Sequence, residues 1–198
     1  MSIVLVGSTS GSVTLQEPAV AGTTVLTLPA VSGTVITTGS SGGVSQAMLA
    51  TGVAGTGPAF RATKSSQQTI SNNTLTKVTF DTETFDTNNN FASSTFTPTV
   101  AGYYQVNYIY SALSLTTGRT YAFSGIIYRN ASAYAQYEHN ITSAADQWGG
   151  MFSTLVYCDG STDYIEAYFY QNNSPAGTIN LASGASVTQF SAVLVRGA

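Results

Sequence analysis

Residues 96–113, FTPTVAGYYQVNYIYSAL, decide the fold class of this chain. Pro98 and Gly102 mark a turn, and the residues that follow alternate as in a β-strand. One face of this strand carries Tyr104, Val106, Tyr108, Tyr110 and Ala112, and the other carries Tyr103, Ile109 and Leu113. An antiparallel sheet normally turns one polar face to water. Because both faces of this strand are apolar, we expect a second cover besides the core, and another copy of the same chain is the expected one.

The composition favours β-structure that is buried in an assembly. Only 8% of the residues are charged, against roughly 25% in ordinary soluble domains. Charge repulsion therefore does little to keep such a surface soluble. A hydrophobic content of 43% and an aromatic content of 11% argue against disorder. The net charge is −3 and the basic residues are scattered, so the pattern predicts no nucleic-acid partner.

The sequence predicts neither export nor membrane insertion. The segment MSIVLVGSTS lacks the basic start and the long apolar run of a secretion signal. No stretch approaches the roughly twenty apolar residues of a membrane span. The single cysteine, Cys158, excludes an internal disulfide and is expected to be a small core residue.

Three segments differ in pattern. Residues 1–38 are β-rich and contain a degenerate repeat, VTLQEPAVAGT (13–23) and LTLPAVSGT (26–34), which predicts a small β-module ordered by attachment. A loosely ordered tail is the alternative. Residues 39–58 have the Gly, Ser and Ala composition of a linker. From residue 59 to 198, period-two patterns alternate with turn signals and predict an all-β, two-sheet sandwich. Its expected strands are 59–65, 75–80, 91–97, 103–113, 119–129, 134–142, 147–158, 161–171 and 185–196.

The segment DYIEAYFYQ (163–171) shows the alternation most clearly. Ile165, Ala167 and Phe169 share one face, which we assign to the core. The other face carries tyrosines, which suit a subunit interface or a contact surface because they combine a large area with a polar tip.

Three motifs in residues 59–198 resemble the globular head of complement component 1q, a trimeric jelly roll of the tumour-necrosis-factor superfamily. They are VTFDTETFDTNNNF (78–91), FTPTVAGYYQV (96–106) and FSAVLV (190–195). In the second, Phe96, Gly102 and Tyr104 are in register with the family signature, and Pro98 is displaced by one. The resemblance implies a jelly roll that trimerises through one sheet. The interface candidates are Tyr104, Tyr108, Tyr110, Tyr164, Tyr168 and Phe190.

The N-terminal segments depart from that family. No Gly-X-Y collagen period is present, and the Pro-Ala-Val-x-Gly-Thr module with its Gly-rich linker looks like the front end of tailed-bacteriophage fibre proteins. This likeness implies a homotrimeric virion fibre, assembled in a bacterial cytoplasm. Residues 1–38 would bind another virion protein, and the C-terminal knob would bind a host receptor, expected to be a carbohydrate.

Catalytic chemistry is not indicated. The only histidine, His139, neighbours Glu138, but adjacent strand residues face opposite ways. No nucleophile, phosphate-binding or zinc motif is present, so we expect a non-enzyme without a cofactor. Calcium ligation is the lesser alternative for turn carboxylates, and its candidates are Asp81, Glu83, Asp159 and Asp163.

Loops with amide and aromatic side chains are the expected receptor contacts. The candidates are Asn88, Asn90, Arg119, Asn130, Tyr134, Trp148, Asn172 and Asn173. Trp148 is expected to stack on a sugar ring if it is exposed, and the alternative places it in the core or the subunit interface. Two other functions remain open: a capsid decoration or head fibre without a specific receptor, and a soluble lectin-like or signalling head.

Overall fold

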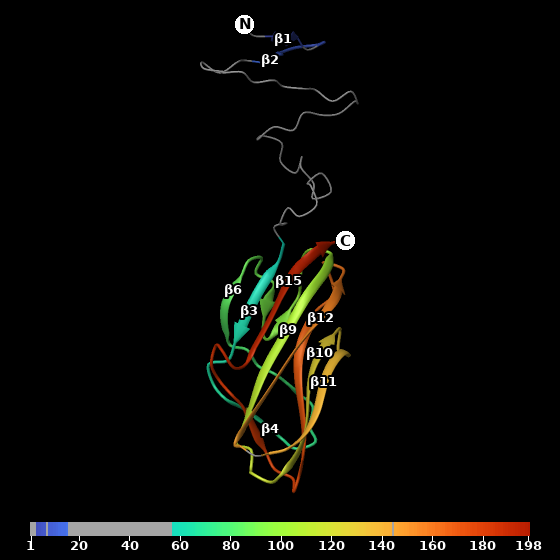
Figure 1. Ribbon diagram of the computed structural model, residues 1–198. Coiled ribbons are helices and arrows are strands. Elements are labelled where there is room, and N and C mark those ends of the chain that lie inside the picture. The colour runs from blue at the N-terminus through green and yellow to red at the C-terminus, as the bar shows by residue number, and fades with distance from the viewer. Residues whose placement is uncertain (1–2, 7, 16–56, 144) are drawn as a thin grey trace, which may run out of the picture. The chain divides into compact units, whose positions relative to one another are not determined.

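The structure is a computed structural model that describes residues 3–6, 8–15, 57–143 and 145–198 (Figure 1). The chain divides into two units, Met1–Val53 and Ala54–Ala198. In the first unit, β1 (Ile3–Val6) and β2 (Ser12–Leu15) form an antiparallel hairpin. Most of the sequence repeat at 13–34, and all of the predicted linker at 39–58 except Gly57 and Pro58, lie outside the described residues.

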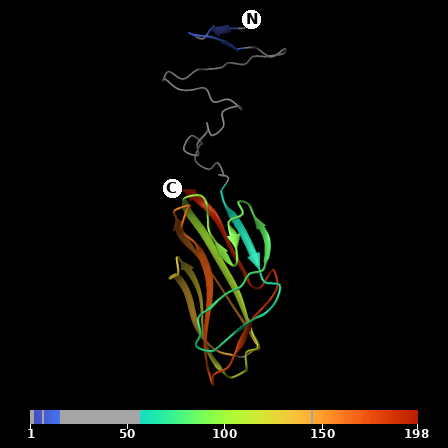
Figure 2. The ribbon, with the colours of Figure 1, turned by 180° about the vertical axis from the view of Figure 1, so that it is seen from behind.

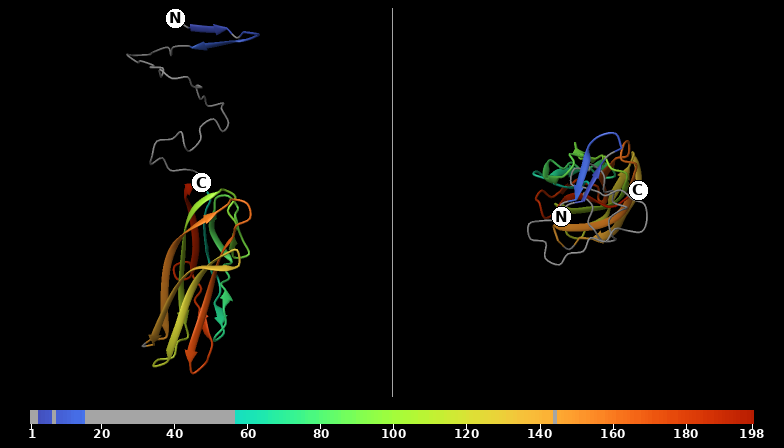
Figure 3. Two further views of the ribbon diagram at one scale, coloured as in Figure 1. Left: turned by 90° about the vertical axis from the view of Figure 1, so that its right-hand side faces the viewer. Right: turned by 90° about the horizontal axis from the view of Figure 1, so that it is seen from above.

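The second unit is a sandwich of two antiparallel sheets, as predicted, and Figures 2 and 3 show its two layers from other sides. One layer, the β10 sheet, has the order β11 (Ser132–Thr142), β10 (Thr120–Arg129), β13 (Ile165–Ser174), β8 (Thr95–Phe96) and β7 (Phe91–Ala92), and β5 (Thr76–Lys77) also pairs with β13. The other layer, the β9 sheet, has the order β4 (Gln68–Ile70), β14 (Ile179–Leu181), β9 (Gly102–Leu113), β15 (Gln189–Gly197), β3 (Ala59–Thr63) and β6 (Thr82–Asp86), and β12 (Gln147–Cys158) also pairs with β9. The described residues include no helix that could cross a membrane.

Strand β9, the deciding stretch of the sequence, is the central strand of its sheet. Its full length pairs with β12, from Gly102 opposite Cys158 to Leu113 opposite Gln147. Its other edge pairs with β15 and then with β14. Residues at the same position along these strands therefore form cross-strand rows that share one face of the sheet.

The chain enters and leaves the sandwich at the same end, which we call the proximal end (Figure 1). Ala59, at the start of β3, lies opposite Val193 of β15. The C-terminal Ala198 donates its backbone N–H to the carbonyl oxygen of Ala101, at 3.1 Å. The loops at the other end, which we call the distal end, include residues 114–119, 175–178 and 182–188.

Aromatic side chains fill the space between the two sheets. Phe60 stacks on Phe91 and Phe96 with ring centroids 4.6 and 4.5 Å apart, and Phe190 meets Phe60 edge-on at 5.0 Å. Further along, Tyr110 meets Phe169 edge-on at 4.8 Å. Such pairs add stabilisation beyond the apolar area that they bury. Cys158 is also buried here, as predicted, and burial raises the pKa of its thiol to about 12.

Tyr110 fits between two glycines, one on each sheet of the sandwich. An ideal Cβ on Gly125 of β10 would lie 2.5 Å from Cε1 of the Tyr110 ring. A Cβ on Gly150 of β12 would also overlap the Tyr110 ring, at its hydroxyl end. These glycines therefore make room for a ring that β9 turns toward the core.

The prediction of a subunit interface is wrong for four residues, because they belong to the core of a single chain. Tyr104, Tyr108 and Phe190 have no exposed surface, and Tyr110 is 1% exposed. The face of β9 that carries these rings is the one that packs on the β10 sheet. Because these rings have almost no exposed surface, any contact that β9 makes with another copy must use its opposite face.

The two faces of β13 follow the prediction. Ile165, Ala167 and Phe169 are fully buried between the sheets. Tyr164 and Tyr168 are half-buried on the outer face of the β10 sheet. Because that face belongs to the other layer, these tyrosines cannot share one continuous interface with the exposed face of β9.

The core tyrosines allow a matched test of this packing. The Tyr108 hydroxyl is buried without a hydrogen-bond partner, whereas the Tyr104 hydroxyl donates to the carbonyl oxygen of Val100 at 2.6 Å. A buried polar group without a partner costs about 1–3 kcal/mol. Tyr108→Phe should therefore raise the free energy of unfolding by about 1 kcal/mol, and Tyr104→Phe should lower it by about 1 kcal/mol. Urea denaturation of the three proteins measures both, and equal effects would contradict the arrangement of the core.

Candidate functional site

The outer side of the β9 sheet carries a largely apolar surface, which we call the apolar face. Its exposed members are Tyr103, Met151, Leu155, Tyr157, Val193 and Val195, each between 38% and 69% exposed. They lie on β9, β12 and β15, and Tyr103 contacts Tyr157 with ring centroids 5.4 Å apart. Large exposed apolar patches mark interaction sites on soluble proteins.

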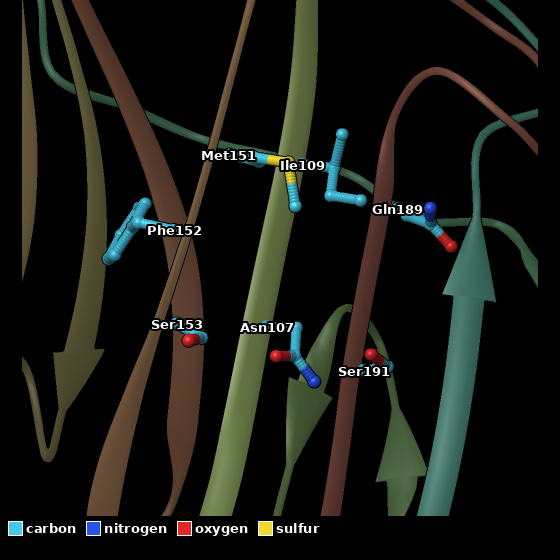
Figure 4. Close-up of a pocket in the computed structure, with 7 residues that line it drawn as sticks. All are labelled: Asn107, Ile109, Met151, Phe152, Ser153, Gln189 and Ser191. Atoms are coloured by element: carbon cyan, nitrogen blue, oxygen red, sulfur yellow. The ribbon is translucent and has the colours of Figure 1, made fainter.

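Three shallow hollows of about 470, 420 and 610 Å³ follow the apolar face from its centre to both ends. The central hollow contains two cross-strand rows, which Figure 4 shows side by side. In one row Met151, Ile109 and Gln189 lie opposite one another, and in the other Ser153, Asn107 and Ser191 do so. The surface is therefore apolar with a band of small uncharged polar groups across its middle.

Charged groups are few on this surface, and one of them is Arg61 of β3, which lies opposite Ser191 and donates to Gln189 Oε1 at 2.7 Å. Among the described residues that line the three hollows, only Arg196 is charged, and it lies in the hollow at the proximal end. A surface with few charges can be removed from water with little of the high cost of burying unpaired ions. The apolar face is therefore suited to burial against another protein surface.

A second apolar patch lies at the open side of the sandwich, where β11 and β12 belong to different sheets. Tyr134 and Tyr137 of β11 and Trp148 of β12 are 46%, 44% and 45% exposed. We call these three residues the aromatic edge. Tyr134 donates its hydroxyl to the carbonyl oxygen of Leu155 at 3.1 Å, so the two strands are linked by a side chain.

His139 packs against the aromatic edge. Its ring centroid is 5.8 Å from that of Trp148 and 5.4 Å from that of Tyr137. The Tyr110 hydroxyl lies 3.4 Å from Nδ1 of His139, and burial lowers the pKa of the imidazole. Glu138 faces the opposite side of the sheet, as predicted. The structure thus assigns the histidine to aromatic packing.

The predicted receptor contacts do not form one site. Asn88, Asn90, Asn130 and Tyr134 lie near the proximal end, whereas Arg119, Trp148, Asn172 and Asn173 lie near the distal end. Asn90 and Asn173 are only 6% and 4% exposed, so the prediction that they contact a receptor is wrong. Asn90 Oδ1 accepts the backbone N–H of Thr99 at 3.2 Å, and Asn173 Nδ2 donates to the carbonyl oxygen of Gly177 at 2.9 Å.

Asn130, although exposed, also has a structural role. Its Nδ2 donates to Asp163 Oδ1 at 2.6 Å, and its Oδ1 accepts the backbone N–H of Tyr164 at 3.0 Å. This amide therefore joins the turn after β10 to the turn before β13. Both the nitrogen and the oxygen of this side-chain amide are therefore hydrogen-bonded within the protein.

Three of the four calcium candidates, Asp81, Asp159 and Asp163, hold loops together through hydrogen bonds. Asp159 accepts the Thr162 hydroxyl at 2.6 Å together with backbone N–H groups of the same turn, and these bonds hold the pKa of Asp159 well below its usual range. The Ser65 hydroxyl donates to Asp81 at 2.7 Å and likewise lowers the pKa of Asp81. Glu83 is exposed on β6. Among the described residues, no group of three or more His, Cys, Asp or Glu side chains is placed to hold a metal ion.

Asp163 forms the most buried ion pair of this turn. Arg129 donates to Asp163 Oδ2 at 2.7 Å, and the Asp163 side chain is 6% exposed. Burial by itself would raise the pKa of Asp163, but hydrogen bonds from Arg129 and Asn130 outweigh it and leave the pKa below its usual value. A carboxylate with a lowered pKa stabilises the fold at a pH above its unfolded value of about 3.9.

We expect this contribution to be lost as the pH falls below about 4. Asp163→Asn should lower the free energy of unfolding at pH 7, because Arg129 loses its charged partner. It should also reduce the loss of stability between pH 5 and pH 2, since the lowered pKa is no longer present. Thermal unfolding across that range measures both effects, with Glu83→Gln on exposed β6 as the control. An unchanged pH profile in Asp163→Asn would contradict this role.

No family model and no curated protein matches the sequence. Among solved structures, 116 chains match. Murine APRIL at pH 5.0 matches with a TM-score of 0.53 at 10% identity, over 70% of this chain and 99% of that one. Its crystal form at pH 8.5 gives 0.50 at 9% identity, over 70% and 98% of the two chains. Eiger TNF from S. frugiperda gives 0.49 at 12% identity, over 71% and 92%. From the two matches to murine APRIL, the second unit has a tumour-necrosis-factor-like jelly-roll fold.

The sequence contained a signal for the apolar face that the prediction did not use. In QWGGMFSTLVYC (147–158), Met151, Leu155 and Tyr157 alternate with residues that face the core. Tyr103 and Ile109 of β9 lie on the same outer face, opposite Tyr157 and Met151. To find the apolar face from the sequence, one must know which face of β9 is buried. Large aromatic residues on both faces of β9 make the two faces look alike.

Proposed function

We propose that the second unit is the head of a homotrimer, joined through the apolar face, and that it forms the terminal knob of a virion fibre that contacts a host surface. The observation that carries the proposal is the apolar face, with its six exposed apolar side chains on β9, β12 and β15. Both the fold and the low charge of the whole chain support it. The sequence resemblance associates this fold with trimerisation through one sheet.

A closed ring needs two different patches on each copy. In a ring with threefold symmetry, one surface of each subunit meets a different surface of the next. The apolar face and the aromatic edge are two such patches, and β12 contributes to both. We assign the aromatic edge of one copy to contact the apolar face of the next, which would cover Tyr134, Tyr137 and Trp148.

The common location of Ala59 and Ala198, where the chain enters and leaves the sandwich, suits a knob on a fibre. Three copies around an axis would receive their chains at the proximal end and would present their distal ends away from it. Residues 1–38 would then bind another virion protein. Three weak receptor contacts in each knob, multiplied by several fibres, would give strong attachment.

Two other functions are distinguished by different observations. A capsid decoration would use the same trimer without a receptor, and deletion of residues 59–198 would then leave infectivity intact. A signalling or lectin-like head is favoured by the fold that the chain shares with murine APRIL. Such a head would be found outside cells and separate from particles.

Charge placed on the apolar face tests the trimer. Leu155 is 54% exposed on this face, and Leu75 is 42% exposed over the other sheet. Leu155→Glu should convert the trimer to monomers without unfolding it, because three carboxylates would be buried without partners. Leu75→Glu, the matched control, should remain trimeric. Light scattering at micromolar concentration gives the mass, and a wild-type monomer would overturn the proposal.

The aromatic edge has a separate test. Trp148→Ala should weaken the trimer at least tenfold, since aromatic residues in the centre of an interface contribute more than about 2 kcal/mol each. Because the side chain is 45% exposed, the stability of the isolated subunit should change little. Sedimentation equilibrium measures the association constant. Unchanged association would exclude this residue from the subunit contact.

The fibre assignment is tested on particles. Antibodies against residues 59–198, labelled with gold, should mark the tips of fibres on virions in electron micrographs. Labelling spread over the capsid shell would favour the decoration, and labelling of secreted protein without particles would favour the signalling head.

A further inference from the structure

The outer face of the β10 sheet contains a groove of about 320 Å³ that the proposed trimer would leave open. We call it the β10 groove, and its main residues are Ser124, Ile126, Tyr128, Gln136, Glu138 and Tyr170. They come from three adjacent strands, with Ser124 opposite both Glu138 of β11 and Tyr170 of β13. This is a sheet surface of fixed register, on the opposite layer from the apolar face.

The polar groups of the groove have few partners within the protein. Ser124 is 5% exposed, and its hydroxyl is buried without a hydrogen-bond partner. Gln136 and Glu138 are exposed on β11, and neither side chain is hydrogen-bonded to another described residue. A buried hydroxyl without a partner costs stability, and its retention at a groove is explained if a ligand supplies the partner.

The groove also has an apolar component of limited size. Ile126 is 7% exposed, between Gln136 on β11 and Tyr168 on β13. Tyr128 and Tyr170 are half-buried, and the Tyr170 ring is fixed because its hydroxyl donates to Asn73 Oδ1. The volume is at the lower end of the range of about 300–1,000 Å³ for small-molecule sites. It therefore suits a ligand no larger than one or two rings.

We propose that the β10 groove binds a neutral pyranose sugar, and this inference rests on the proposed function of the knob in host contact. A pyranose presents hydroxyl groups at its rim and C–H groups on its face. The Glu138 carboxylate accepts two hydroxyls, the Gln136 amide both donates and accepts, and Ser124 completes the set at the floor. The Tyr128 and Tyr170 rings and Ile126 provide the apolar surface for the sugar face.

The charges around the groove disfavour an acidic sugar. Glu138 is the only charged side chain among the described residues that line it. Lys77 of β5, which lies opposite Tyr168 of β13, is already paired with Glu166 at 2.6 Å. A carboxylate-bearing sugar would therefore meet a like charge without a compensating cation.

The test uses the full-length protein and saturation-transfer NMR with simple sugars at millimolar concentration. The neutral probes are the methyl glycosides of glucose, galactose and mannose, together with N-acetylglucosamine. N-acetylneuraminic acid and tetramethylammonium are the charged probes. We expect transfer to at least one neutral sugar and to neither charged probe.

Variants locate the binding. Glu138→Gln should weaken the affinity about tenfold, as expected for loss of hydrogen bonds to a charged acceptor. Asn140→Ala, on the same outer face of β11 but outside the groove, is the matched control and should bind normally. Ser124→Ala should weaken the affinity severalfold and should leave the melting temperature unchanged or higher, because it removes a buried hydroxyl without a partner. A lower affinity together with an unchanged or higher melting temperature would show that Ser124 has a binding role and not a structural one.

The outcomes separate the groove from the proposed function. If Glu138→Gln and Ser124→Ala bind sugar as the wild type does, the β10 groove is not the sugar site, although the knob still binds sugar elsewhere. Binding of a charged probe alone would overturn the ligand class. If no probe binds, the inference is overturned, and the trimer and fibre are still judged by the mass measurement and by gold labelling.

Discussion

The rest of the structure depends on one constraint, namely which alternate side chains of β9 face the core and which face outward. Its pairing with β12 and β15 fixes which side chains face the β10 sheet, and a shift of one residue would exchange the two faces. Tyr104, Tyr108 and Tyr110 complete the core, and Gly125 and Gly150 are small because Tyr110 occupies the space beside them. The same alternation places Tyr103 and Ile109 on the outside. One strand thus supplies both the interior of the subunit and the surface proposed for assembly.

Each sheet carries one of the two proposed functions: the β9 sheet carries the surface proposed for assembly, and the β10 sheet carries the groove proposed for ligand binding. The β9 sheet carries an apolar surface with few charges, which suits a permanent contact because few ions must be desolvated. The β10 sheet carries a groove whose polar groups have few internal partners, which suits a reversible ligand. At the open side between β11 and β12, the core aromatic residues continue into the exposed Tyr137 and Trp148. The sandwich is therefore not closed by its own chain at this side.

The sequence predicted the sheet architecture well and the surfaces poorly. Long strands with clear alternation, such as 103–113 and 147–158, lie within a residue of β9 and β12. The short strands β4, β6 and β14 were missed, because three to five residues contain too few alternations and their pairing depends on distant partners. Core tyrosines were assigned to the interface since tyrosine suits both environments. The β10 groove combines residues of β10, β11 and β13 whose proximity follows from register, which local patterns do not contain.

The shared location of Pro58 and Ala198 has a practical consequence. A protein fused to the C-terminus would lie beside the incoming chain, and in a trimer three such additions would crowd a single end. The distal loop at residues 114–119 is instead solvent-exposed over most of its length and connects two long strands. Peptides for display or labelling are better inserted into this loop, because β9 and β10 place it at the opposite end of the sandwich from Pro58 and Ala198.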